Sequence, residues 1–312
     1  MPPFDPPPGR PGRSLLDAIR GGAITVDGGM GTALLDLGIR FDVNYEALVL
    51  TRPELVQGIH EGYLRAGAQL LETNTFGGNR VRLARHGLDG EVRAVNVAAA
   101  RLARAAAGER AHVAGAMGPT GLTLAGASDQ ARERVRSAFR EQAEALAEGG
   151  VDALMIETMR QPEEIALALS GARQAVGDAL PILALVSVGE GLTMADGTPV
   201  GVMGERLRAL GCDVLGVNCC DSAEAVVAAV EKLLPLGVPL AALPSAGLPT
   251  RVGDRFVYPS TPAQLGVLAR RLRALGVRLL GGCCGTTPEH VRRIAAAVRA
   301  DRLVDQPLVA AR

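Results

Sequence analysis

The chain contains no tryptophan, and aromatic residues make up only 3% of its 312 residues. Aliphatic side chains must therefore fill the core, which is feasible because 48% of the residues are hydrophobic. Neither sign of charge dominates, since 33 basic residues, nearly all of them arginine, balance 33 acidic ones. A chain with no basic stripe has no electrostatic means of attracting a polyanion, so we expect no nucleic-acid partner.

Long hydrophobic runs are also missing. The longest apolar stretches, such as residues 181–188, are far shorter than a membrane-spanning helix requires. The amino terminus lacks the basic-then-apolar pattern of a secretory signal. We therefore expect a cytoplasmic protein with no membrane partner. Residues 1–13 are rich in proline and glycine and are predicted to be a disordered tail ahead of one domain over residues 14–312.

Short runs rich in Val, Ile and Leu alternate with longer Ala-, Leu- and Arg-rich stretches that have helical spacing. Eight such runs are predicted to be strands: residues 23–29, 69–76, 112–118, 153–159, 181–188, 214–220, 239–246 and 277–284. Strands that are apolar on both faces and separated by helices belong to parallel sheets. Eight units predict a single (β/α)₈ TIM barrel. An open doubly wound sheet is the alternative, but no G-x-G-x-x-G fingerprint follows the first run.

Five cysteines occur, an odd number that argues against a disulfide framework. Cys219 and Cys220 end one predicted strand, Cys283 and Cys284 end another, and Cys212 stands alone. The carboxyl ends of barrel strands form one face, and that face carries the active site. The two doublets are therefore predicted to lie on the functional face.

Neighbouring residues on a regular strand point to opposite sides of the sheet. Cys283 and Cys284 can reach one point only if the backbone leaves strand geometry, which the glycines of residues 281–285 permit. A third thiolate from the sixth strand would complete a three-cysteine set with an open fourth position, the pattern of a catalytic zinc. Spacing alone does not choose between Cys219 and Cys220, and simple packing of the cysteines in the core is the alternative.

Four segments, in order along the chain, resemble the homocysteine S-methyltransferase family. They are V-D-G-G-M-G-T at residues 26–32, E-T-N-T-F at 72–76, G-V-N-C at 216–219 and G-G-C-C-G-T-T-P at 281–288. The last string is the most specific, and the likeness covers essentially residues 15–300.

This resemblance implies a barrel that binds Zn²⁺ through Cys219, Cys283 and Cys284. It also implies that Glu157 holds the amino group of homocysteine and that the backbone around Asp27–Gly29, which includes Gly28, receives the substrate carboxylate. For Glu157, the alternative is a charge at the barrel mouth paired with an arginine. For Asp27, it is a turn-forming role.

The end of the second predicted strand supplies further substrate-binding candidates: Glu72, Asn74 and Thr75. The alternative is that Asn74 and Thr75 only close the turn. Many relatives carry P-N-A-G after the seventh strand, where this chain has P-S-A-G, and in some members the asparagine lies near the metal without substrate. We expect Ser245 or a water there.

The chemistry that the resemblance implies is methyl transfer to homocysteine, which gives methionine. A free thiol has a pKa of about 8.5, and zinc ligation removes its proton. The donor must be activated, and the scarcity of aromatic residues argues against a cage for betaine. We therefore expect S-methylmethionine or another sulfonium as donor. The alternatives are a homocysteine-activating subunit of a split cobalamin- and methyltetrahydrofolate-dependent methionine synthase, which needs a separate corrinoid protein, and a methyltransferase for another thiol or selenol.

Overall fold

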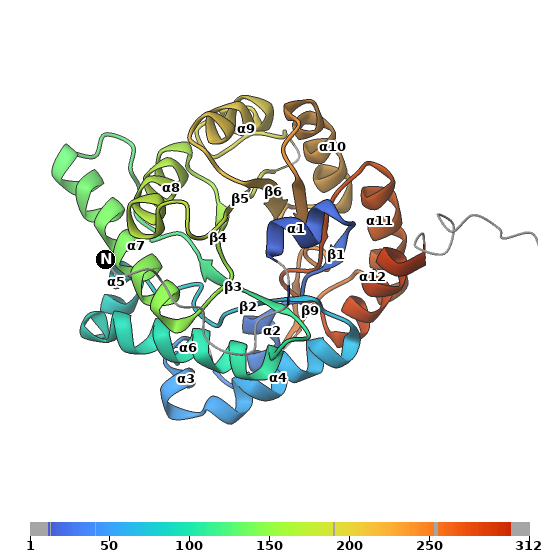
Figure 1. Cartoon of the computed structure of the whole chain (residues 1–312), viewed down its shortest axis with the longest axis horizontal. Coiled ribbons are helices and arrows are strands. Elements are labelled where there is room, and N and C mark those ends of the chain that lie inside the picture. Colours follow the sequence, from blue (N-terminus) through green and yellow to red (C-terminus); the bar gives the residue numbers. More distant parts are fainter. Residues whose placement is uncertain (1–11, 13, 41, 190, 253–254, 301–312) are drawn as a thin grey trace, which may run out of the picture.

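Eight parallel strands form the centre of the computed structural model, which describes residues 12, 14–40, 42–189, 191–252 and 255–300 (Figure 1). The strands lie in the order β1-β10-β7-β6-β5-β4-β3-β2, and a parallel bridge between Val26 and Leu70 joins the two ends of the sheet. Their bounds are β1 (Ile24–Thr25), β2 (Leu70–Glu72), β3 (His112–Met117), β4 (Ala153–Met159), β5 (Ile182–Val186), β6 (Val214–Asn218), β7 (Leu240–Leu243) and β10 (Leu279–Leu280). The predicted (β/α)₈ barrel is confirmed, and the open sheet is excluded.

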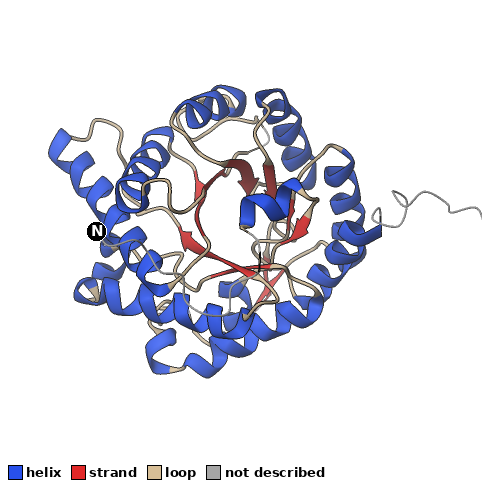
Figure 2. Cartoon of the chain, in the orientation of Figure 1, coloured by secondary structure: helices blue, strands red, loops and turns tan. Residues whose placement is uncertain are grey.

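Helices surround this ring of strands (Figure 2). They are α2 (Met30–Asp36), α3 (Leu48–Thr51), α4 (Pro53–Ala66), α5 (Arg80–Leu83), α6 (Val92–Ala107), α7 (Asp129–Gly149), α8 (Pro162–Val176), α9 (Val200–Ala209), α10 (Ala223–Leu233), α11 (Pro262–Ala274) and α12 (Pro288–Ala300). A further helix, α1 (Leu15–Arg20), lies across the barrel opening in Figure 1. Its Leu15 and Ile19 pack against the apolar side chains inside the barrel, so α1 closes the amino-terminal end.

The core has two apolar layers, one inside the barrel and one between strands and helices. Met155, Leu183 and Leu185 belong to the inner layer, whereas Leu154, Ile156 and Ala184 belong to the outer one. Consecutive strand residues thus face opposite layers, and both layers are apolar. This is why each strand reads as a continuous hydrophobic run.

Most strands are shorter than the sequence predicts, and the difference lies mainly at their carboxyl ends. The strand β6 ends at Asn218 rather than at Cys220, and β10 ends at Leu280 rather than at Cys284. The segments beyond these ends are loops that carry the polar residues of the barrel mouth. An unpredicted antiparallel hairpin, β8 (Thr250–Val252) with β9 (Arg255–Val257), follows β7.

The predicted tail of residues 1–13 lies outside the described residues except for Gly12, and residues 301–312 at the other end of the predicted domain also lie outside them. Among the described helices, none combines the length and apolar character that crossing a membrane demands.

Candidate metal and substrate site

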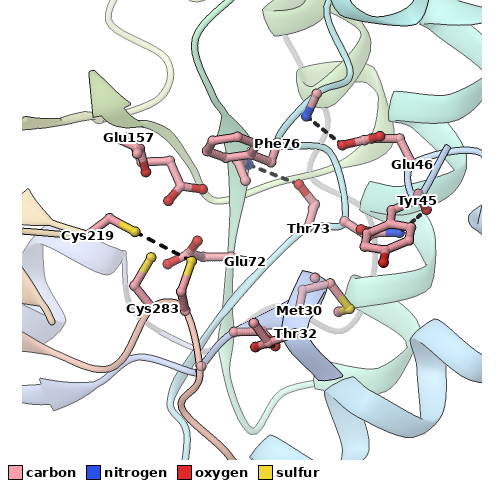
Figure 3. A pocket seen from close by; sticks show the side chains of 18 of the residues that line it. Met30, Thr32, Tyr45, Glu46, Glu72, Thr73, Phe76, Glu157, Cys219 and Cys283 are labelled. Atoms are coloured by element: carbon pink, nitrogen blue, oxygen red, sulfur yellow. Dashed lines mark hydrogen bonds between the residues drawn. The ribbon is translucent and has the colours of Figure 1, made fainter. Parts of the chain in front are cut away.

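A cavity of about 460 Å³ opens at the carboxyl ends of the strands. Its deeper wall contains Cys219, Cys283 and Cys284 together with three carboxylates, those of Asp27, Glu72 and Glu157. In Figure 3, Glu157 and Glu72 extend toward the space beside the sulfur atoms, and Tyr45 and Glu46 lie on the opposite side. The structure therefore brings side chains from loops that are more than 200 residues apart into one site.

The three cysteine Sγ atoms lie within 4.8 Å of one another, and the Sγ atoms of Cys219 and Cys284 are 3.5 Å apart. Tetrahedral zinc with Zn–S bonds of about 2.3 Å holds its sulfur ligands about 3.8 Å apart. The observed spacing fits that requirement. Cys220 does not join the cluster, because its buried Sγ donates to the carbonyl oxygen of Asn218.

Cys219 occupies a strained backbone conformation directly after β6. Its φ is +52°, in the left-handed region that residues with a side chain rarely adopt. Two hydrogen bonds hold Cys219 in this conformation. Its N–H donates to the carbonyl of Leu243 at 3.3 Å, and its carbonyl accepts from the hydroxyl of Ser187 at 2.9 Å. Strain of this kind persists where the surroundings impose it, typically at functional sites. Here it ends the strand and directs the thiol into the cavity.

Cys283 and Cys284 lie in a tight turn that Gly285 makes possible. The N–H and the hydroxyl of Thr286 both donate to the carbonyl of Cys283, at 3.2 and 2.7 Å. Gly285 has a φ of +75°, and a Cβ there would lie 2.1 Å from the Tyr258 ring. Only glycine satisfies both constraints. The predicted departure from strand geometry around the doublet is confirmed.

A second loop packs against this turn through Gly29. A Cβ on Gly29 would lie 2.7 Å from the carbonyl oxygen of Cys283. The Gly29 N–H donates to the hydroxyl of Thr286 at 3.1 Å, and the phenol of Tyr63 lies within hydrogen-bond distance of the carbonyls of both Gly29 and Thr286, at 3.2 and 2.9 Å. The buried tyrosine thus ties the loop after β1 to the cysteine turn.

The thiols share their protons unequally. Hydrogen bonds from Cys283 and Cys284 lower the pKa of Cys219 to about 3. The same contact with Cys219 raises the pKa of Cys284 to about 12 and raises that of Cys283 as well. Ser245 lies 3.3 Å from the Cys219 sulfur through its Oγ atom. Cys219 is therefore the most acidic of the three thiols.

For the three carboxyl groups, burial outweighs the hydrogen bonds that they accept. Burial raises the pKa of Asp27, that of Glu72 and that of Glu157, the last to about 7, and the charge of Glu157 raises the pKa of Asp27 and Glu72 further. The Oδ2 atom of Asp27 accepts from the N–H of Glu72 at 3.0 Å, whereas its buried Oδ1 has no hydrogen-bond partner in the described part of the chain. None of the three forms an ion pair with a described basic residue. This wall suits a cation.

Asn218 fixes the position of Glu157. The register of β4 shifts between Ile156 and Met159, and Thr158 has a φ of +56°. The side-chain amide of Asn218 donates to Glu157 Oε2 at 2.9 Å and lies 3.8 Å from the Cys283 sulfur, and its Oδ1 accepts from the Thr158 N–H at 2.7 Å. One fully buried side chain thus links the carboxylate to the cysteine cluster.

Two of the predicted substrate residues, Asn74 and Thr75, use their side chains in hydrogen bonds to backbone carbonyls. Asn74 lines the cavity, but its amide donates to the carbonyl of Tyr45 at 2.7 Å. Thr75 is fully buried and donates to the carbonyl of Ala116 at 2.7 Å, so the structure does not bring it into the cavity.

The roles of Asn218 and Tyr63 are not predicted from the sequence. Asn218 belongs to the G-V-N-C segment that resembles the family, whereas Tyr63 belongs to none of the four segments.

Comparisons with known proteins agree with this geometry. A family model described as Homocysteine S-methyltransferase matches residues 24–298. Methionine synthases from Mycobacterium leprae and Mycobacterium tuberculosis are 33% and 34% identical over 302 and 303 residues. Each match covers 91% of this chain and 25% of the relative, so the chain spans about a quarter of their length.

The fold also matches solved structures of the homocysteine methyltransferase MmuM from Escherichia coli. The metallated form is 27% identical, with a TM-score of 0.74, and the match covers 88% of this chain and 96% of that one. The oxidised form is 28% identical, with a TM-score of 0.76, and the match covers 91% and 98%. The family model covers most of the chain, and the barrel and the cysteine cluster agree with it. The chain therefore belongs to the homocysteine S-methyltransferase family.

Proposed function

We propose that this protein binds Zn²⁺ through Cys219, Cys283 and Cys284 and transfers a methyl group from a sulfonium donor to homocysteine. The observation that carries the proposal is the convergence of three Sγ atoms within 4.8 Å on the wall of the cavity. Bound zinc would act as a Lewis acid that favours the thiolate form of a substrate thiol at neutral pH. The three reduced cysteines suit a reducing compartment such as the cytoplasm.

The carboxylate wall binds the substrate ammonium in this proposal. Asp27 has an unpartnered buried oxygen, and Glu157 is held beside the cysteines by Asn218. Glu72 shares a proton with Glu157, and an arriving ammonium would favour the ionised form of both. The wall therefore orients homocysteine with its sulfur toward the metal ligands.

The substrate carboxylate lies beside Gly28 and Gly29 in this arrangement. Both glycines line the cavity directly before α2, whose first N–H groups lack helical partners, whereas the N–H of Gly29 itself donates to Thr286. Asn74 holds the neighbouring loop through Tyr45, and Thr75 supports the turn after β2. Ser245 stabilises the Cys219 thiolate through its hydroxyl.

The methyl transfer itself requires no side-chain base. The homocysteine sulfur forms a bond to the methyl carbon as the bond from that carbon to the sulfonium sulfur breaks. The electron pair of the broken bond returns to the donor, which leaves as a neutral thioether. A sulfonium fits the cavity because carboxyl groups line its deep wall and because Tyr45 and Phe76 offer aromatic faces to a cation. S-methylmethionine is the donor that we favour.

A second candidate is the homocysteine-binding part of a cobalamin-dependent methionine synthase. The observation that favours it is the identity of 33–34% to the mycobacterial methionine synthases. In that case methyl transfer would require a corrinoid protein.

A donor panel separates the two candidates. Reduced, zinc-loaded protein is incubated with homocysteine and either S-methylmethionine, methylcobalamin or a methylated corrinoid protein, and methionine is quantified. We expect turnover with S-methylmethionine alone. Turnover only with the corrinoid protein would favour the second candidate, and an acceptor panel with other thiols and selenols would expose a different acceptor. Failure to bind zinc would contradict both.

A further inference from the structure

The rim of the cavity is basic, in contrast to its deep wall. Arg82, Arg85 and His86 line the same cavity as the cysteines. Arg85 and His86 are exposed and Arg82 is half-buried, whereas Asp27 and Glu157 are buried. The cavity therefore has basic side chains at its mouth and carboxyl groups in its interior.

The Arg85 side chain is held in place. Its Nη2 atom donates to the carbonyl of Thr120 at 3.1 Å and to that of Gly121 at 3.4 Å. A Cβ on Gly121 would lie 2.7 Å from this nitrogen, so the glycine leaves room for the guanidinium. Arg82 is fixed at its backbone, because its N–H donates to the side chain of Asn79, which caps α5. Two arginines are thus positioned by the fold at one edge of the cavity.

Two carboxylates, Glu164 and Glu46, lie near this rim without forming an ion pair with it among the described residues. Arg85 and His86 form no ion pair with any residue in the described ranges. Glu164 lies near Arg82, but this buried carboxylate accepts from the N–H of Thr120 at 2.8 Å. Glu46, which also lines the cavity, accepts from the N–H of Gly77 at 2.7 Å. Two guanidinium groups without a carboxylate ion-pair partner in the described ranges therefore line this edge of the cavity.

We infer that Arg85, with Arg82 and His86, binds an oxyanion carried by the methyl donor. The inference rests on the proposed function, in which homocysteine occupies the deep wall. In the proposed function the deep wall, which contains three carboxyl groups, is already occupied by homocysteine, so the anionic end of a donor lies at the mouth, where the arginines line the cavity. Guanidinium groups suit such an oxyanion, because they can donate two hydrogen bonds to it. An amino-acid sulfonium supplies a carboxylate, and a corrinoid supplies a phosphate.

Arg85→Ala tests this assignment. The KM for S-methylmethionine is expected to rise about tenfold, with zinc content and the KM for homocysteine unchanged. An analogue without the carboxylate, (3-aminopropyl)dimethylsulfonium, should show no such rise. Arg82→Ala should also raise the KM for S-methylmethionine, and Arg85→Lys should raise it less than Arg85→Ala does. Arg80→Ala is the matched control, because Arg80 pairs with Glu141 and does not line the cavity.

The same variants assayed with methylcobalamin distinguish the carboxylate of a sulfonium from the phosphate of a corrinoid. Only the KM of the donor that binds the rim will change. Equal losses for S-methylmethionine and its carboxylate-free analogue would overturn the inference. A rise in the KM for homocysteine alone in Arg85→Ala would also overturn it, as would an unchanged KM for both donors in that variant. If the wild-type protein turns over neither donor, the proposed function fails. The inference is then decided by calorimetric binding of S-methylmethionine and its analogue to wild type and Arg85→Ala.

Discussion

The two ends of β4 carry carboxylates in opposite situations. Asp152, directly before the strand, accepts from the N–H of Val113 at 2.8 Å and pairs with Arg104. Although burial raises the pKa of Asp152, a hydrogen bond from His112 and the charge of Arg104 lower it overall. Glu157, near the other end, has no basic partner among the described residues, and burial raises its pKa to about 7.

This contrast separates stability from function between the two ends of the barrel strands. At the amino-terminal end, charges are matched: Arg173 also pairs with Asp213 at 2.9 Å ahead of β6. At the carboxyl-terminal end, buried carboxyl groups have no basic partner among the described residues, and Thr158 and Cys219 hold strained backbone conformations. Uncompensated charge and strain lower stability unless a ligand uses them. The carboxyl end is therefore prepared for substrate, and the amino end stabilises the barrel.

Cys283→Ser should have the largest effect at the carboxyl end. Loss of one of three ligands should abolish zinc binding and lower activity at least about a thousandfold, while the fold remains. Metal analysis, a methionine assay and circular dichroism check this prediction. Cys212→Ala is the control and should retain zinc, because Cys212 lies away from the cluster. Loss of the circular dichroism spectrum in Cys283→Ser would show that the cysteine turn supports the fold itself.

Asp152→Asn should have the complementary effect at the amino end. It leaves the buried Arg104 without its counter-charge, which should lower the free energy of unfolding by about 3 kcal/mol. Urea denaturation measures this change, and zinc content and both KM values should be unaffected. Asp178→Asn, at a fully exposed position, should alter stability by less than about 0.5 kcal/mol. A large change in KM for Asp152→Asn would break the separation of roles.

Glu157→Gln should weaken homocysteine binding without loss of zinc. Removing a charged partner of the substrate ammonium should raise the KM for homocysteine about tenfold to a hundredfold. Steady-state kinetics measures the change, and a homocysteine analogue without the amino group should bind wild type and variant equally. Glu163→Gln, on the outer helix α8, is the control. An unchanged KM would remove Glu157 from the substrate site.

The pH dependence of stability should have opposite signs at the two ends of β4. Between pH 4.5 and about 7, folded Glu157 retains a proton that the unfolded chain has lost, so its contribution to the unfolding free energy falls as pH rises. The slope is at most about 1.4 kcal/mol per pH unit. For Asp152, the stabilising contribution is present above the unfolded pKa and is lost as pH falls through the folded value.

Urea denaturation of wild type and Glu157→Gln between pH 5 and 8 checks this prediction. The variant should gain stability relative to wild type as pH rises toward 7. A constant difference between the two proteins across this range would contradict the assignment of a raised pKa to Glu157.

The sequence predicted the barrel well because its signal is local and repeated. Each strand is apolar on both faces, and each run is bounded by a helical stretch. The ends of the strands were less predictable, since Cys219 and Thr158 leave strand geometry through hydrogen bonds to distant residues, Leu243 and Asn218 respectively.

The candidate metal ligands were named from the family resemblance, and the structure brings their sulfurs together. The supporting residues were not foreseen. Tyr63 acts across 223 residues of sequence to reach Thr286, and no local pattern marks such a contact. The position of Thr75 depends in the same way on pairing between β2 and β3, which places its hydroxyl against Ala116 rather than in the cavity.

Zinc K-edge X-ray absorption on the reduced protein, before and after addition of homocysteine, tests the central claim most directly. One zinc per chain should show three sulfur neighbours at about 2.3 Å and one lighter ligand, and homocysteine should raise the sulfur count to four. A sulfur count that stays unchanged on addition of homocysteine, or a reduced protein that binds no zinc, would contradict the account.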